Sequence, residues 1–269
     1  MDRREAMLRE LNLYPQWARR GQPAPVVAQE VHATSSEEAC RALARHAGLK
    51  PDLQSSSIKP EASRLGGDEA DTQRSAMSIV ALNPSRASWP ELKQQVKNCT
   101  ACKLRAGCTQ TVFGVGDEQA GWLFVGEGPG ADEDALGEPF VGEAGKLLDN
   151  MLMAIKLKRG QNAYIANVVK CRPPGNRTPK ADEIATCLPY LHRQIALIPP
   201  KLIVALGKVA SNALLGREAT IASLRGTLHD YHGIPLIVTY HPAYLLRSPS
   251  EKAKAWQDLC LAVKTAAGI

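Results

Sequence analysis

The sequence has no long apolar run. Although 44% of its 269 residues are apolar, no stretch approaches the roughly 18 consecutive apolar residues that a membrane-spanning helix needs. The first 20 residues carry Arg and Glu throughout, which excludes a secretory signal peptide. We therefore expect a soluble, cytoplasmic protein. In that reducing compartment the seven cysteines are candidates for metal ligands rather than for structural disulfides.

The sequence also lacks a strong charge imbalance. Its formal net charge is +6, and the part after residue 87 holds 21 Lys and Arg against 16 Asp and Glu. This excess is compatible with a polyanionic partner such as nucleic acid. It is more typical of an ordinary, slightly basic protein, because nucleic-acid-binding modules usually carry a larger excess. Charge alone therefore identifies no class of function.

Residues 1–87 lack the apolar periodicity of a folded domain. They are rich in Pro, Ser and Ala, and such a composition buries too little surface to offset the entropy of ordering. We interpret them as a mostly disordered arm with one or two short helices. A cluster of Leu11, Tyr14 and Trp17 suggests a further hypothesis, in which the arm docks on a protein partner.

From Ser88 onward, apolar runs alternate with helical patterns. Ser88-Trp-Pro-Glu91 is a capping box that starts a first short helix. The alternation predicts an α/β fold of three layers, a mostly parallel four-stranded central sheet flanked by helices. Ligands bind such sheets at the carboxyl ends of the strands, so the residues after the strands are the candidates for a site. The strands are predicted at 122–125, 164–169, 202–206 and 236–240, and the helices at 88–99, 147–155, 178–191, 209–215 and 251–266.

Four cysteines form the strongest pattern. Cys99 and Cys102 form C-x2-C at a helix end, Cys171 follows the second strand, and Cys187 lies on the next helix. Four thiolates from two segments can surround a zinc ion or an iron-sulfur cube. A zinc ribbon normally supplies two C-x2-C knuckles, so the wider second spacing favours the iron-sulfur cluster. Four unrelated buried thiols are the alternative. Three cysteines are interpreted as bystanders: Cys40, Cys108 and Cys260.

Two further motifs follow predicted strands. Gly126-Glu-Gly-Pro-Gly130 lets backbone amides approach a ligand closely. It lacks the lysine of a P-loop and the spacing of a dinucleotide fingerprint, which disfavours nucleotide triphosphate binding. In His241-Pro-Ala-Tyr-Leu-Leu-Arg247, the histidine can donate to a ligand and the apolar residues can wedge into a duplex. A lone histidine is more often a structural group, so neither motif identifies a function by itself.

Together these motifs resemble the family 4 uracil-DNA glycosylases, which carry a 4Fe-4S cluster. The resemblance also rests on Pro139-Phe-Val-Gly142, on Asn167-Val-Val-Lys-Cys-Arg-Pro-Pro174 and on all four cysteine positions. It covers about residues 88–269 and gives the arm no function. It implies a hydrolase that flips uracil out of single- or double-stranded DNA and cuts its N-glycosidic bond, which leaves an abasic site at the start of base excision repair.

The resemblance also implies how the uracil pocket is built. Phe140 would stack on the flipped uracil, and Asn167 would read the Watson–Crick edge with an amide that both donates and accepts. Glu133 would crowd a 5-methyl group and so exclude thymine. Gly126 and Gly128 would belong to the same pocket.

The implied chemistry rests on residues at the strand ends. His241 would hydrogen-bond uracil O2 and stabilise the negative charge that develops as the bond breaks. Gly128 stands where better known uracil-DNA glycosylases have an aspartate, which favours a dissociative route with Glu127 positioning the water. Leu245 would fill the vacated stack, and Arg247 would contact the DNA backbone. Hydrolysis transfers no electrons, so the cluster would hold loops in place.

Two other classes remain as alternatives. A non-enzymatic iron-sulfur or zinc nucleic-acid-binding module would need the cysteines and a basic face, but not the polar residues at converging strand ends. An electron-transfer protein would have no use for the Tyr-Leu-Leu-Arg segment after His241. A monomer is the default expectation for all three classes.

Overall fold

The computed structural model describes residues 84–269. The expected arm helices, the docking cluster around Trp17 and Cys40 lie outside the described residues. A 3-10 turn, η2 (Pro84–Arg86), comes first. Ala87 is buried, and its carbonyl accepts a hydrogen bond of 2.6 Å from Arg193 Nε. The packed part of the chain therefore includes residues just before Ser88.

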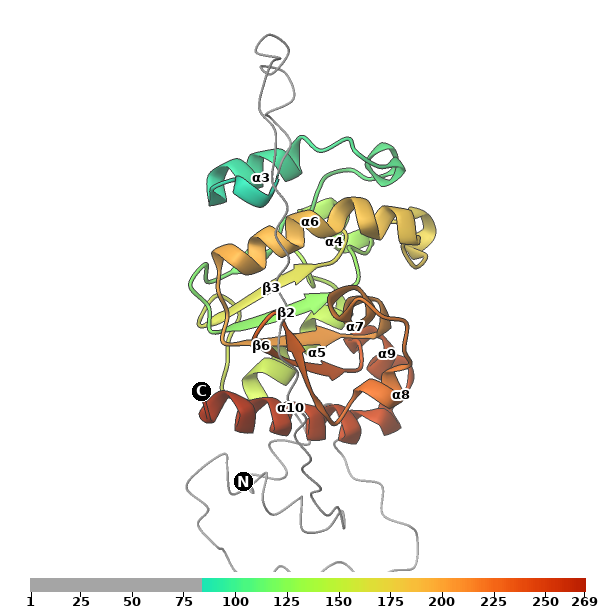
Figure 1. Ribbon diagram of the computed structural model, residues 1–269. Helices are drawn as coiled ribbons and strands as arrows, with labels where there is room; N and C mark the ends of the chain where they lie inside the picture. Colours follow the sequence, from blue (N-terminus) through green and yellow to red (C-terminus); the bar gives the residue numbers. More distant parts are fainter. Residues whose placement is uncertain (1–83) are drawn as a thin grey trace, which may run out of the picture. The chain divides into compact units, whose positions relative to one another are not determined.

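A six-stranded sheet forms the centre of the described chain (Figure 1). The strand order is β1-β3-β2-β4-β6-β5; the inner four strands are parallel, and the two edge strands pair antiparallel. The parallel centre confirms the predicted sheet, and the antiparallel edges make the whole sheet mixed. The strands are β1 (Val115–Gly116), β2 (Trp122–Gly126), β3 (Ala163–Asn167), β4 (Leu202–Leu206), β5 (Leu228–Tyr231) and β6 (Ile234–Thr239).

Helices cover both faces of the sheet (Figure 1). Side chains alternate between the two faces of a strand, so Leu123 and Val125 of β2 join one core and Trp122 and Phe124 join the other. The first core is completed by α3 (Trp89–Lys97), α6 (Ala181–Leu197) and α7 (Lys208–Leu215), and the second by α5 (Glu143–Ala154) and α10 (Lys252–Ala267). The predicted three-layer α/β architecture is confirmed. Shorter elements connect these layers: α4 (Ala131–Leu136), α8 (Ile221–Leu224), α9 (Pro242–Arg247), η3 (Lys103–Gly107), η4 (Pro174–Asn176) and η5 (Pro249–Glu251).

Helix ends follow local capping chemistry. Glu91 accepts hydrogen bonds of 2.7 Å from both the backbone N and the hydroxyl of Ser88, which fixes the start of α3. Helix α6 begins later than its predicted Thr178 cap, because Glu183 accepts from the backbone N of Lys180. None of the helices in residues 84–269 is long and apolar enough to cross a membrane.

Register brings two predicted motifs together. In the parallel pair of β2 and β3, Gly126 lies opposite Asn167 at the carboxyl ends of both strands. Strand β6 ends two residues before His241, at the same edge of the sheet. The segments that follow these strands therefore begin side by side.

Candidate functional site

The carboxyl ends of the parallel strands open into a cavity of about 710 Å³. Its walls come from the segments after β2, β3, β4 and β6 and from the loop before α5. Seven of the nine predicted pocket and DNA-contact residues line it: Glu127, Gly128, Glu133, Phe140, Asn167, His241 and Arg247. The strand-end rule thus brings together side chains that are more than 100 positions apart in sequence.

Gly126 lies beside two of these side chains. A Cβ at this position would lie 2.4 Å from Asn167 Oδ1 and 2.6 Å from Phe140 Cζ, so only glycine fits. Asn167 is 2% exposed, and its Oδ1 has no hydrogen-bond partner in the described chain. A buried acceptor without a partner costs about 1–3 kcal/mol. It therefore favours a ligand that brings an N–H donor.

His241 is held as a neutral donor. Its Nδ1 accepts a hydrogen bond of 3.1 Å from the backbone N of Ala243, which assigns the proton to Nε2. Burial, and then the positive charge of Arg247, lowers its pKa to about 4. The ring lies 5.5 Å from that of Phe140, between centroids and in a stacked orientation. At neutral pH this imidazole can donate one hydrogen bond to a ligand without carrying charge.

The two glutamates of the site differ in what they contact. Burial raises the pKa of Glu127, and no other cause contributes to the shift. Glu133 accepts hydrogen bonds from three backbone N–H groups, those of Gly130 at 3.0 Å, Val141 at 2.9 Å and Gly142 at 3.2 Å. Its carboxylate therefore ties the start of α4 to the loop that carries Phe140.

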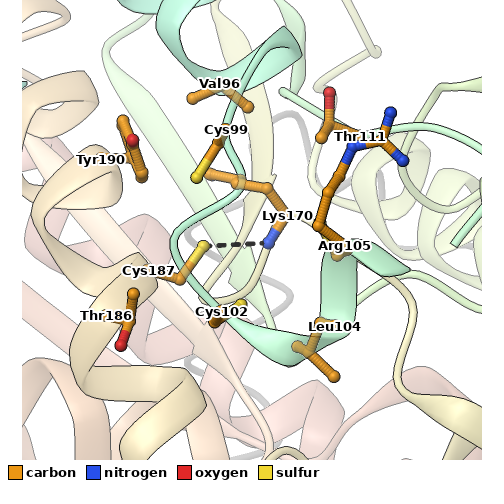
Figure 2. A pocket seen from close by; sticks show the side chains of 11 residues that line it. Val96, Cys99, Cys102, Leu104, Arg105, Thr111, Lys170, Thr186, Cys187 and Tyr190 are labelled. Carbon is orange, nitrogen blue, oxygen red and sulfur yellow. Dashed lines mark hydrogen bonds between the residues drawn. The ribbon is translucent and has the colours of Figure 1, made fainter. Parts of the chain in front are cut away.

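All four predicted cysteine ligands line a second, smaller pocket beside α3 and α6. Figure 2 labels three of them, Cys99, Cys102 and Cys187. Cys171 and Cys187 are buried, whereas Cys99 and Cys102 are half-buried. Within residues 84–269, no three His, Cys, Asp or Glu side chains lie close enough to hold a single metal ion.

Two of the predicted bystander cysteines lie in the described chain. Burial and then the neighbouring Cys108 thiol raise the pKa of Cys171, yet Cys108 does not line the pocket. Cys260 is buried in α10 on the other face of the sheet. Four sulfurs converge on the pocket, as the spacing predicts.

Comparison with known proteins agrees with this geometry. The family model of the uracil DNA glycosylase superfamily matches residues 113–260. A type-4 uracil-DNA glycosylase of Pyrobaculum aerophilum is 41% identical over 181 residues, which cover 64% of this chain and 91% of the relative. One from Thermotoga maritima is 45% identical over 165 residues, 61% of this chain and 85% of the relative. The chain belongs to the type-4 uracil-DNA glycosylases.

The residue expected to be the duplex wedge is buried. The family resemblance implies that role for Leu245, but in this type-4 chain its side chain is 1% exposed and packs into the core with α5 and α10. The exposed apolar side chains of the segment are Tyr244, at 38%, and Leu246, at 40%. Leu245 is buried while its neighbours are exposed because the segment forms the short helix α9, in which one residue in three or four faces the core.

Sequence reasoning also missed a buried lysine between the two pockets. The Nζ of Lys170 donates to the carbonyl of Asn167 at 2.8 Å and to Gln194 Oε1 at 2.6 Å. Its backbone N donates to Cys187 Sγ at 3.3 Å (Figure 2). Burial lowers the pKa of Lys170 to about 8. The sequence signal that could have revealed Lys170 is the presence of a lysine within the apolar run that follows β3. In this type-4 enzyme Lys170 links the cysteine pocket to Asn167.

Proposed function

We propose that this protein takes uracil from DNA into the 710 Å³ cavity and hydrolyses its N-glycosidic bond, which initiates base excision repair. The observation that carries the proposal is the buried Oδ1 of Asn167, which has no partner in the described chain and lies beside Gly126, as Phe140 does, in the same cavity as the neutral His241. The names of the type-4 relatives support the same activity.

The base would be recognised by its hydrogen-bonding edge. Uracil offers an N3–H donor to Asn167 Oδ1 and an O4 acceptor to the amide nitrogen, whereas cytosine offers the reverse pattern. Phe140 would stack on the base. Glu133, held by three backbone N–H groups, would keep its place against a 5-methyl group and so exclude thymine. Gly126 and Gly128 would let the backbone approach the base.

The chemistry would follow a dissociative route. As the bond between C1′ and N1 breaks, negative charge develops on the uracil, and His241 Nε2–H would donate to O2 where that charge appears. A water molecule then adds its oxygen to C1′ and gives up a proton, which neutralises the uracil anion so that free uracil and an abasic site remain. Glu127, desolvated at the mouth of β2, would position that water. Because its Nδ1 is already engaged, His241 does not need to reorient during the reaction.

The DNA strand would lie across the outer cavity. Arg247 lines it and would contact a phosphate. Since Leu245 is buried, we assign the wedge to Leu246 and Tyr244, the exposed apolar residues of α9. The basic excess after residue 87 favours such a polyanionic partner.

The second pocket suits a 4Fe-4S cluster, because four cysteine thiols from two segments of the chain line it. We propose Cys99, Cys102, Cys171 and Cys187 as its ligands. When bound, the cluster would cross-link the segment before β1 to the segment after β3 and take no part in the hydrolysis. Lys170 would place a buried positive charge beside the cluster and hold the carbonyl of Asn167.

The proposal describes a cytoplasmic monomer and is tested by one assay. The brown, purified protein is incubated with single- and double-stranded oligonucleotides that carry one uracil, and abasic sites are then cleaved with alkali. Strand breaks at the uracil position support the proposal, and thymine- and cytosine-containing oligonucleotides are the controls. Binding without strand breaks would support the non-enzymatic module instead.

A further inference from the structure

Phe140, the candidate stacking residue, has a strained backbone. Its φ is 56°, in the left-handed region that residues other than glycine seldom occupy. Such a conformation persists only where the surroundings enforce it, and it is common at binding sites. The residues that enforce it therefore control where the ring stands.

Arg159 holds the two peptide groups on either side of Phe140. Its Nη1 donates to the carbonyl of Pro139 and its Nη2 to the carbonyl of Phe140, each at 2.7 Å. The first carbonyl belongs to the peptide plane before the Phe140 Cα and the second to the plane after it. Since φ and ψ are the rotations of these two planes about the Cα, a rigid guanidinium that holds both oxygens fixes both angles.

Two other contacts complete this clamp. Arg159 is itself oriented by Asp149 of α5, whose Oδ1 lies 3.1 Å from Nε and 3.0 Å from Nη2. Glu133 accepts from the backbone N of Val141 at 2.9 Å, so the peptide group after Phe140 is held at its oxygen and at its nitrogen. Gly145 lets α5 approach closely, because a Cβ there would overlap the carbonyl of Phe140.

We propose that Arg159 is a positioning residue for base capture, which acts on the uracil only through the backbone of Phe140. The inference rests on the proposed function and extends it to a residue outside the cavity lining. Arg159 carries a charge beside a glycosylase pocket, yet its Nε, Nη1 and Nη2 donors face the protein, toward two carbonyls and one carboxylate. It holds the stacking ring and does not bind a DNA phosphate.

Arg159→Lys tests this role with little change in charge. A lysine ammonium can reach one of the two carbonyls, but it cannot hold two peptide planes in a fixed relation. We expect free uracil to inhibit the variant about tenfold to a hundredfold more weakly, with a comparable loss of kcat/KM on a uracil oligonucleotide, since displacement of a stacking group by about 1 Å has costs of this size. Lys158→Met, which removes the neighbouring exposed charge, is the matched control and should leave both quantities unchanged.

A double-mutant cycle with Phe140→Ala separates positioning from general stabilisation. If Arg159 acts through the ring, Arg159→Lys should weaken uracil inhibition in the parent and have no further effect in Phe140→Ala. An equal fold-loss in both backgrounds, or parent-like inhibition in Arg159→Lys, would overturn the proposal. Should Arg159→Lys not fold, Asp149→Asn carries the same cycle with a smaller expected loss, because it frees Arg159 but keeps both carbonyl bonds. A parent protein that makes no abasic sites would refute the proposed function instead, which is a separate result.

Discussion

A single methyl group at Gly126 should disable the pocket. In Gly126→Ala, the new Cβ would lie 2.4 Å from Asn167 Oδ1 and 2.6 Å from Phe140 Cζ, whereas ordinary contacts begin at 3.4 Å. Both side chains must therefore retreat by about 1 Å, and misplacement on that scale costs on the order of a hundredfold in rate. A hundredfold loss of kcat/KM corresponds to about 3 kcal/mol of transition-state stabilisation.

The assay for Gly126→Ala measures kcat/KM on a single-uracil oligonucleotide together with the melting temperature and the visible absorbance of the protein. Overpacking should lower the free energy of unfolding by about 1–3 kcal/mol and leave a folded protein. Gly268→Ala is the control, because its Cβ would meet nothing closer than 3.7 Å, at Thr265 O. A folded Gly126→Ala protein with the activity of the parent would refute the claim that Asn167 and Phe140 must lie close to the backbone of Gly126 to bind the base.

Three further predictions follow from burial and charge. Because the pKa of His241 is lowered to about 4, the unfolded chain binds its proton more tightly, and the free energy of unfolding should fall by about 2–3 kcal/mol between pH 7 and pH 4.5. His241→Gln should lose that part of the pH dependence in denaturant titrations. Leu245→Ala should lower the free energy of unfolding by about 2–5 kcal/mol. Leu246→Ala should change the free energy of unfolding by less than about 0.5 kcal/mol and weaken activity on double-stranded DNA. The opposite result, a loss of double-strand activity in Leu245→Ala but not in Leu246→Ala, would support Leu245 as the wedge. If Cys187 is a ligand of the proposed cluster, Cys187→Ser should lose the visible absorbance of the cluster and melt at lower temperature. A variant without this absorbance but with the stability of the parent would contradict the proposal that the cluster holds loops in place.

The parts of the fold that the sequence predicted are those with strong local signals. The run Leu202–Leu206 is apolar at every position and forms β4 with the predicted bounds, and α7 ends at Gly216 with the left-handed φ of 62° that glycine allows. Strand β5 was missed because its sequence, Leu-His-Asp-Tyr, has one buried position and pairs only at the sheet edge. Its formation depends on β6, which is a tertiary contact that no local pattern reports.

The candidate site divides in the same way. His241 was singled out because it follows a predicted strand, where the topology gathers ligand-binding groups, whereas Asn167 was assigned through the family resemblance. Arg159 and Lys170 were missed because each acts on backbone carbonyls, which carry no sequence signature. The burial of Leu245 was not foreseen, because the segment after β6 could form a loop or a short helix, and only packing against α5 and α10 decides which side chain turns inward.

The central claim is that Asn167 reads uracil with an acceptor that has no other partner in the described chain. The most direct measurement compares Asn167→Ala with the parent on single-uracil oligonucleotides, after confirming that the variant keeps the visible absorbance and the melting temperature of the parent. The account predicts a loss of at least about a hundredfold in kcat/KM, because the variant leaves the buried N3–H of uracil unpaired. A folded Asn167→Ala protein with the absorbance and the full activity of the parent would contradict it.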